Sequence, residues 1–117
     1  MFNVLYIQPI HPEGMDYLKN KANYNVMVAS STDLETLKTE MQDADVIVTR
    51  LTDLREDLLR CAPHLKAVCK HGVGVDNIDV AYCNAHNIAV VTTGDANSST
   101  VAEQTMLAIG ALLRKTV

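Results

Sequence analysis

Two glycines flank one valine in the stretch CKHGVGVDNID at residues 69–79, and they are the first residues whose types and spacing could bind a ligand. A glycine pair of this kind begins the dinucleotide-binding unit, which also needs a third glycine three positions after the second and a helix directly behind it. Position 77 is Asn, and the next helical pattern begins only near Asp79 and is short. The loop is therefore not predicted to bind a dinucleotide.

The same glycines suit a small anion. Without Cβ atoms, backbone N–H groups can approach a carboxylate closely, and the amides of Val73 and Gly74 would be the donors. The alternative is a tight turn that only joins a strand to a helix. Composition alone favours that turn, so both interpretations stay open at this point.

Cysteine and histidine provide the other side chains that could bind a metal. Cys61 and His64, and also Cys83 and His86, share a spacing that fits a helix, but the sequence has no Cys-x-x-Cys pair. We therefore predict free, mostly buried thiols and no metal site. Three cysteines are an odd number without disulfide spacing, which is typical of a reducing cytoplasm.

The composition narrows the class of protein. The chain has 117 residues, 48% of them hydrophobic, and a net charge of −4, which suits one domain with an aliphatic core. The acidic balance argues against a nucleic-acid partner, and the apolar stretches are too short to span a membrane. Met1 leads directly into a strand-like segment without a basic leader, so we expect a cytoplasmic protein.

The elements that must position these loops alternate along the chain. Continuous apolar runs predict strands at 3–10, 24–30, 45–50, 65–70 and 88–93, and apolar spacing predicts helices at 11–21, 32–44, 52–62, 77–87 and 100–115. Thr-x-x-Glu pairs at Thr32 and Thr100 predict helix caps. This order indicates an α/β protein with a flavodoxin-like, doubly wound, five-stranded parallel sheet of order 2-1-3-4-5.

Ligands of such sheets bind beyond the carboxyl ends of the strands. The polar residues that follow the predicted strands include Gln8, Arg50, residues 70–77 and residues 93–98. Because parallel strands end at one edge, we expect these groups to lie near one another.

Two motifs resemble a known family. Residues 72–79 (GVGVDNID) and 97–103 (NSSTVAE) are similar to the front part of the NAD-dependent D-2-hydroxyacid dehydrogenases, in particular the phosphoglycerate dehydrogenase branch. The resemblance implies that residues 1–117 are the substrate-binding domain. It also implies that residues 98–117 form the helix that leads toward an NAD-binding domain absent from this chain.

The resemblance also implies roles for individual residues. The amides of Val73 and Gly74 would bind the carboxylate of a 2-hydroxy acid, and Asn97 would help to close the site. Arg50 and Lys70 correspond to two basic residues that hold the phosphate of 3-phosphoglycerate, although Lys70 replaces the usual arginine and lacks its bidentate fork. The alternative for this pair is ordinary solvated charge.

A second departure from the family pattern, after that of Lys70, bears on the exact substrate. Gly94 and Asp95 stand where many members have Pro-Gly. If Asp95 pointed into an anion site, its carboxylate would repel the substrate.

The chemistry of the family needs an Arg, a His and a Glu that lie in or after the NAD-binding domain, and no residue here matches them. We therefore predict no catalytic, cofactor-binding or metal residue in this chain, NAD as the cofactor of the full-length enzyme only, and no activity of the chain alone. The apolar helix at 100–115 predicts a homodimer. The alternatives are a stand-alone module that binds a small anion or dimerises, and a truncated remnant.

Overall fold

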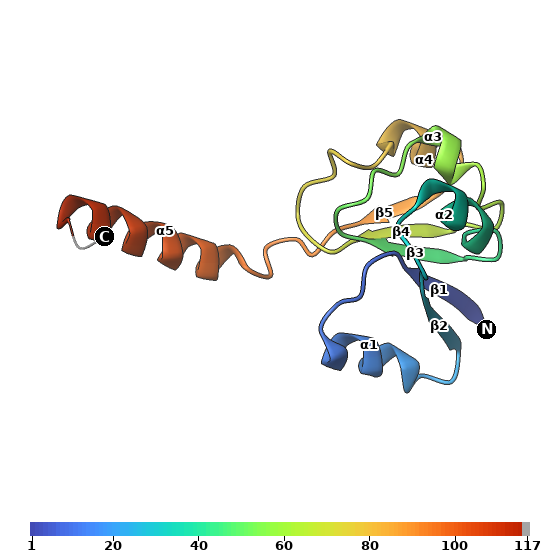
Figure 1. The fold of residues 1–117 in the computed structure, drawn as a ribbon, viewed down its shortest axis with the longest axis horizontal. Coiled ribbons are helices and arrows are strands. Elements are labelled where there is room, and N and C mark those ends of the chain that lie inside the picture. Colours follow the sequence, from blue (N-terminus) through green and yellow to red (C-terminus); the bar gives the residue numbers. More distant parts are fainter. Residues whose placement is uncertain (116–117) are drawn as a thin grey trace.

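The computed structural model describes residues 1–115 and contains a five-stranded parallel sheet with the strand order β2-β1-β3-β4-β5 (Figure 1). The predicted fold class is therefore confirmed. Each strand is shorter than its apolar run, because the ends of the runs belong to connecting loops. The strands are β1 (Phe2–Tyr6), β2 (Tyr24–Val28), β3 (Val46–Thr49), β4 (Ala67–Lys70) and β5 (Ala89–Val91).

Helices lie on both faces of the sheet (Figure 1). Helix α1 (Pro12–Lys19) covers one face, and α2 (Leu34–Glu40), α3 (Glu56–Leu59) and α4 (Val80–Ala85) cover the other. Helix α5 (Ser98–Leu113) does not pack on the sheet but projects away from the α/β body. The molecule is consequently 54 Å long and only 25 Å thick.

The core is divided by the sheet. Alternate residues of a strand point to opposite faces, so Leu5 packs with α2–α4 whereas Val4 and Tyr6 pack with Met15 of α1. The larger cluster lies under α2–α4 and includes Leu37, which is fully buried. The smaller cluster under α1 has only three buried members.

Three local predictions were wrong. The helix expected at 52–62 is only the four-residue α3, because the preceding loop pairs Leu54 with Ile78 instead of coiling. Helix α2 is capped by Asp33, which accepts a hydrogen bond from the amide of Thr36, and not by Thr32. Helix α5 begins at Ser98, before Thr100, and its N-cap residue Asn97 makes no side-chain cap bond. Residues 116–117 of the predicted last helix lie outside the described residues.

Two apolar surfaces of the molecule are exposed, one on helix α5 and one on the sheet. None of its own residues is buried, and Leu107 is 69% exposed. On the α1 face of the sheet, a hollow of about 430 Å³ beside α1 is lined by Val48, Cys69 and Val91 among others. No helix within residues 1–115 is long and apolar enough to cross a membrane.

Candidate functional site

The carboxyl edge of the sheet brings most of the predicted site residues together. A hollow of about 320 Å³ is lined by residues that follow β3 and β4, namely Arg50, Leu51, Lys70, Gly74, Asp76 and Asn77. A neighbouring hollow of about 260 Å³ is lined by His71, Gly72, Thr93, Ala96 and Asn97. Arg50, Lys70 and Gly74 therefore share one hollow, and Asn97 lines the next. Val73 lies between the glycines that line the two hollows, with its side chain exposed.

The glycine loop needs glycine at one position for its shape. Gly72 has a φ of +151°, and a Cβ there would lie 3.3 Å from Cε of Lys70. The Gly72 carbonyl accepts a hydrogen bond of 3.1 Å from the amide of Thr93, which ties the loop to the end of β5. A Cβ on Gly74 would meet no heavy atom within 4 Å, so the space beside this residue is open to a ligand.

The backbone amides of this loop have the property that an anion site requires. Within residues 1–115, the amides of Val73 and Gly74 donate no hydrogen bond to the protein. Unpaired N–H groups beside an open hollow can bind a carboxylate with charge-assisted hydrogen bonds. The geometry thus favours the anion site over the plain turn.

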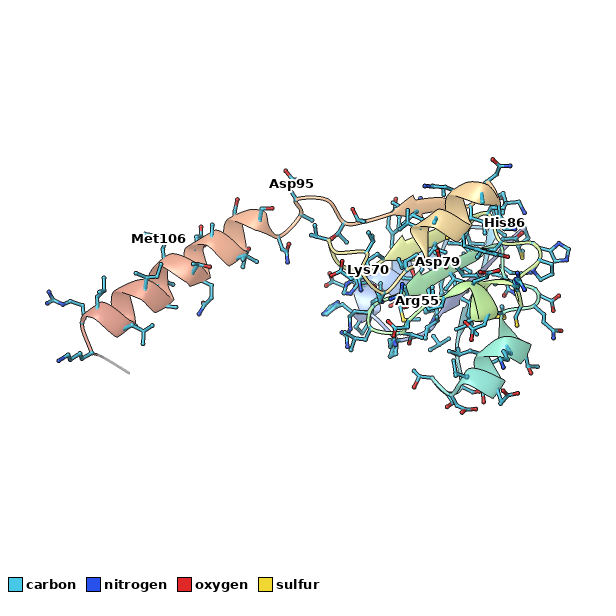
Figure 2. All side chains as sticks on the ribbon, turned by 90° about the horizontal axis from the view of Figure 1, so that it is seen from above. Arg55, Lys70, Asp79, His86, Asp95 and Met106 are labelled. Atoms are coloured by element: carbon cyan, nitrogen blue, oxygen red, sulfur yellow. The ribbon has the colours of Figure 1, made fainter. Side chains whose placement is uncertain are left out.

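Arg50 and Lys70 are not equivalent. The Lys70 ammonium donates one hydrogen bond to the Arg50 carbonyl and another, 3.0 Å long, to Oδ1 of Asn77. The Arg50 guanidinium has no hydrogen bond or ion pair within the described part of the chain. Arg50 is exposed and available to a ligand, whereas Lys70 is half-buried and engaged. Figure 2 shows Lys70 on the side of the α/β body that faces the connection to α5.

Asn77 connects the two loops of the site. Its Nδ2 donates to the Thr52 carbonyl over 2.8 Å, and its own carbonyl accepts from the amide of Leu54 over 2.7 Å. Arg55 adds a hydrogen bond of 2.7 Å from its guanidinium to the carbonyl of Asp76. Asn77, which interrupts the dinucleotide pattern, therefore links the two loops by hydrogen bonds. The sequence pattern predicted no role for Asn77, although an amide side chain at the third glycine position was a usable signal.

Gln8, two residues after β1, supports the loop that carries Arg50. Its Nε2 donates to the Thr52 hydroxyl over 2.6 Å, and its Oε1 accepts from the amide of Arg50 over 3.1 Å. The buried Thr49 hydroxyl donates to the Thr52 carbonyl over 3.3 Å. The backbone that carries Arg50 is thus fixed by side chains of its neighbours, although the Arg50 side chain remains unpaired.

Asp95 does not oppose an anion here. It lies on the connection between β5 and α5, is exposed, and lines neither hollow of the carboxyl edge (Figure 2). Its carbonyl accepts a hydrogen bond of 3.0 Å from the amide of Ser98 at the start of α5. The carboxylate that does line the Arg50 hollow is Asp76.

The remaining reactive side chains form no second site. Cys83 is buried, Cys61 and Cys69 are half-buried, and all three are free. Burial raises the pKa of the Cys69 and Cys83 thiols, which keeps both protonated and weakly nucleophilic. Within residues 1–115, no three His, Cys, Asp or Glu side chains are grouped so that they could hold a metal ion.

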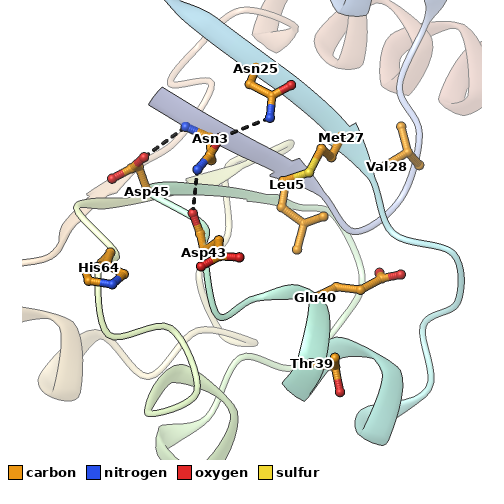
Figure 3. A pocket seen from close by; sticks show the side chains of 10 residues that line it. All are labelled: Asn3, Leu5, Asn25, Met27, Val28, Thr39, Glu40, Asp43, Asp45 and His64. Carbon is orange, nitrogen blue, oxygen red and sulfur yellow. Dashed lines mark hydrogen bonds between the residues drawn. The ribbon is translucent and has the colours of Figure 1, made fainter. Parts of the chain in front are cut away.

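A larger hollow of about 750 Å³ lies elsewhere, between the α2 face of β1 and β2 and the loop before β3 (Figure 3). Its polar groups bind one another. The Asn3 side chain donates to the Asp43 carbonyl over 2.9 Å and accepts from Asn25 over 3.0 Å, while the Asn3 amide donates to Asp45. Size alone therefore does not mark the site, because the unpaired donors lie at the carboxyl edge.

The comparisons with known proteins identify the family of the chain. Residues 4–113 match the model of the catalytic domain of D-isomer specific 2-hydroxyacid dehydrogenases, and the chain belongs to this family. The expected resemblance is therefore confirmed. The chain is 38% identical over 107 residues to D-3-phosphoglycerate dehydrogenase of Methanocaldococcus jannaschii, a match that covers 91% of this chain and 20% of that protein.

Two solved structures show the same fold. NAD⁺-bound 3-phosphoglycerate dehydrogenase of Entamoeba histolytica superimposes with a TM-score of 0.78 and 26% identity, covering 95% of this chain and 38% of that one. D-lactate dehydrogenase of Aquifex aeolicus, complexed with NAD and lactic acid, gives a TM-score of 0.79 and 27% identity, covering 94% and 33%. The chain thus spans well under half the length of these relatives.

Proposed function

We propose that this chain is the substrate-binding domain of an NAD-dependent D-2-hydroxyacid dehydrogenase and that it binds the carboxylate of a small 2-hydroxy acid. The observation that carries the proposal is the pair of unbonded amides at Val73 and Gly74, beside the hollow that holds the unpaired guanidinium of Arg50. Family membership supports the reaction class, the transfer of a hydride from the C2 carbon of the acid.

Each residue has a physical task in this proposal. Two amides donate to one carboxylate, and the guanidinium adds positive charge and planar donors. Asn97 lies in the adjoining hollow at the start of α5, where it would close over the bound acid. The names of the relatives suggest 3-phosphoglycerate and D-lactate as substrates, and the 2-hydroxy carboxylate is common to both.

NAD is the hydride acceptor in this proposal, but the residues of this chain do not fit it. The Asn77 side chain fills the place of the third glycine, and the helix behind the loop, α4, has only six residues. A dinucleotide loop needs close backbone approach and a helix N-terminus aimed at the pyrophosphate. We therefore assign NAD binding, and the catalytic Arg, His and Glu, to a domain to which residues 98–117 would lead.

Helix α5 supports a homodimer. Its apolar side chains point into solvent all around, including Val101, Met106 and Leu112 (Figure 2). Such a helix gains free energy when a second surface covers it. We propose that residues 100–115 pair with a second copy of the chain.

The site can be tested by titrating D-glycerate into the ¹⁵N-labelled chain. We expect shifts of the Val73 and Gly74 amide resonances and of the Arg50 side-chain Nε–H. The Arg50→Met variant should weaken binding about tenfold, as expected for one lost charge-assisted contact. If no resonance of the loop moves, the proposal that this chain by itself binds the carboxylate is wrong.

The second test concerns chemistry. We expect the purified chain to reduce no NAD in the presence of D-lactate, D-glycerate or 3-phosphoglycerate, because hydride transfer needs a positioned nicotinamide and a base within reach of the hydroxyl proton. Absorbance at the wavelength of NADH is the measurement. Turnover above a heat-denatured control would contradict the assignment of catalysis to another domain.

A further inference from the structure

The charges around the Arg50 hollow narrow the class of substrate. Three charged residues line it, namely Arg50, Lys70 and Asp76. A phosphorylated acid would bring a phosphate dianion in addition to its carboxylate. Two free cations would suit that ligand, and the question is whether both cations are free.

The Lys70 ammonium is already used within the protein. Two of its three donors are engaged, one by the Arg50 carbonyl and the other by Oδ1 of Asn77. Both acceptors belong to the loops that form the site. If Lys70 turned toward a phosphate, the Arg50 carbonyl and Asn77 Oδ1 would each lose a hydrogen bond. Asn77 would then be held only through its Nδ2, which donates to the Thr52 carbonyl, and through its backbone.

Asp76 opposes a dianion in the same hollow. Its backbone is held there, because its carbonyl accepts the hydrogen bond from Arg55, and its exposed carboxylate adds a negative charge to the lining. The lining therefore carries two cations and one carboxylate, and within the described residues only the Arg50 guanidinium is a cation without a hydrogen-bond partner.

We propose that Lys70 is a positioning residue and that the site recognises the carboxylate of a 2-hydroxy acid without recognising a phosphate. The Lys70 ammonium links the Arg50 carbonyl to the Asn77 side chain. This link fixes the distance between the loop that carries the Arg50 guanidinium and the loop that carries the Val73 and Gly74 amides. This inference rests on the proposed carboxylate site and deepens it by naming the substrate class.

The test compares two acids that differ only by the phosphate, D-glycerate and D-3-phosphoglycerate, on the ¹⁵N-labelled chain. We expect their dissociation constants to agree within about threefold, because Lys70 is held by its two hydrogen bonds and Asp76 repels the dianion. The Lys70→Met variant keeps most of the apolar stem and removes the ammonium. It should weaken both acids by the same factor, because the loops lose their spacing. Lys66→Met is the matched control, since Lys66 lies at the amino end of β4 and should leave both constants unchanged.

The outcomes separate the two proposals. If 3-phosphoglycerate binds about tenfold or more tightly than glycerate, and Lys70→Met removes only that preference, Lys70 is a phosphate ligand and the inference is wrong while the carboxylate site stands. If neither acid moves the Val73 and Gly74 resonances, the carboxylate site itself is wrong, and the inference falls with it. The comparison in the unsubstituted chain decides the question even if Lys70→Met fails to fold.

Discussion

At the residue scale, Gly72 and Gly74 of one motif have different structural roles. Gly72 shapes the loop, because L side chains rarely adopt its φ of +151° and a Cβ there would lie only 3.3 Å from Cε of Lys70. Gly74 leaves room, because nothing of the protein lies where its Cβ would be. One motif therefore combines a requirement of folding with a requirement of binding, and the two can be separated by substitution.

Gly72→Ala should destabilise the chain by about 1–3 kcal/mol, the usual cost of an L side chain in a strained backbone conformation. Gly74→Ala should change stability by no more than about 0.5–1 kcal/mol, since its φ is not positive and its surroundings are open. Urea unfolding measures both values. Glycerate binding should nevertheless weaken in Gly74→Ala, because the methyl group occupies the approach to the amides. Equal losses of stability would contradict this division.

Asp45 provides a pH-dependent contribution to stability. Its carboxylate accepts hydrogen bonds from Lys66 Nζ, over 2.6 Å, and from the Asn3 amide, over 2.9 Å, and these contacts lower its pKa. A carboxyl group whose pKa is lower in the folded than in the unfolded chain stabilises the fold above its usual pKa. That stabilisation is lost as the pH falls through the folded value.

Asp45→Asn should therefore lower the free energy of unfolding at pH 7 by about 1 kcal/mol or less, as expected for an ion pair whose lysine is exposed to solvent. The difference from the unsubstituted chain should shrink below pH about 4, near the ordinary aspartate pKa. Urea unfolding at pH 7 and pH 3 is the measurement. The matched control is Glu35→Gln, which removes the exposed pair with Lys38. A difference for Asp45→Asn that grows at low pH would refute the role of the carboxylate.

At the scale of elements, the site depends on two loops that are tied to each other. The loop after β3 and the loop after β4 meet through Asn77, Lys70 and the Leu54–Ile78 bridge. Short hydrogen-bonded contacts take the place of the part of the predicted helix at 52–62 that precedes α3. This arrangement keeps the guanidinium of Arg50 and the glycine loop in one hollow.

Asn77→Gly completes the G-x-G-x-x-G pattern in sequence, yet we expect it to create no nucleotide site. It removes the bond to the Thr52 carbonyl and the acceptor of Lys70, so it should cost about 1–3 kcal/mol. Unfolding by urea and NADH fluorescence are the two measurements. Asn77→Asp is the control that keeps the acceptor for Lys70 and loses the donor to Thr52. Saturable NADH binding by the glycine variant would show that the loop, rather than its context, excludes the nucleotide.

At the scale of the whole molecule, the helices cover the two faces of the sheet to different extents. Three helices bury one face of the sheet, whereas α1 covers only part of the other, and α5 projects away from both (Figure 1). The exposed helix and the apolar hollow at Val48, Cys69 and Val91 are surfaces that a larger assembly would cover.

The association of α5 is testable by substitution. We expect the chain to form dimers and Leu107→Glu to shift them to monomers, since a buried carboxylate would replace an apolar contact. Sedimentation over a range of concentrations is the measurement. Gln104→Glu adds the same charge to the same helix at a polar position and should leave the dimer intact. A monomer at every concentration would contradict the proposed dimer.

Much of this architecture was predictable because it depends on local pattern. Continuous apolar runs that alternate with helical spacing require a parallel sheet buried on both faces, and the order 2-1-3-4-5 agrees with the observed sheet. The GVGVDNID and NSSTVAE motifs identified the family, which the comparison confirmed. Arg50, Lys70 and Gly74 could be placed together since parallel strands end at one edge.

Only the tertiary structure decided what each of these residues does there. Asn77, Thr52 and Gln8 are far apart in the chain, and their hydrogen bonds exist only once β1, β3 and β4 lie side by side. Lys70 and Arg50 look alike as charges in the sequence, but one is engaged by neighbouring loops and the other is unpaired. Side-chain type and spacing thus determined which groups reach the site. Long-range hydrogen bonding determined which of them remain available to a ligand, because a donor already paired within the fold is lost to binding.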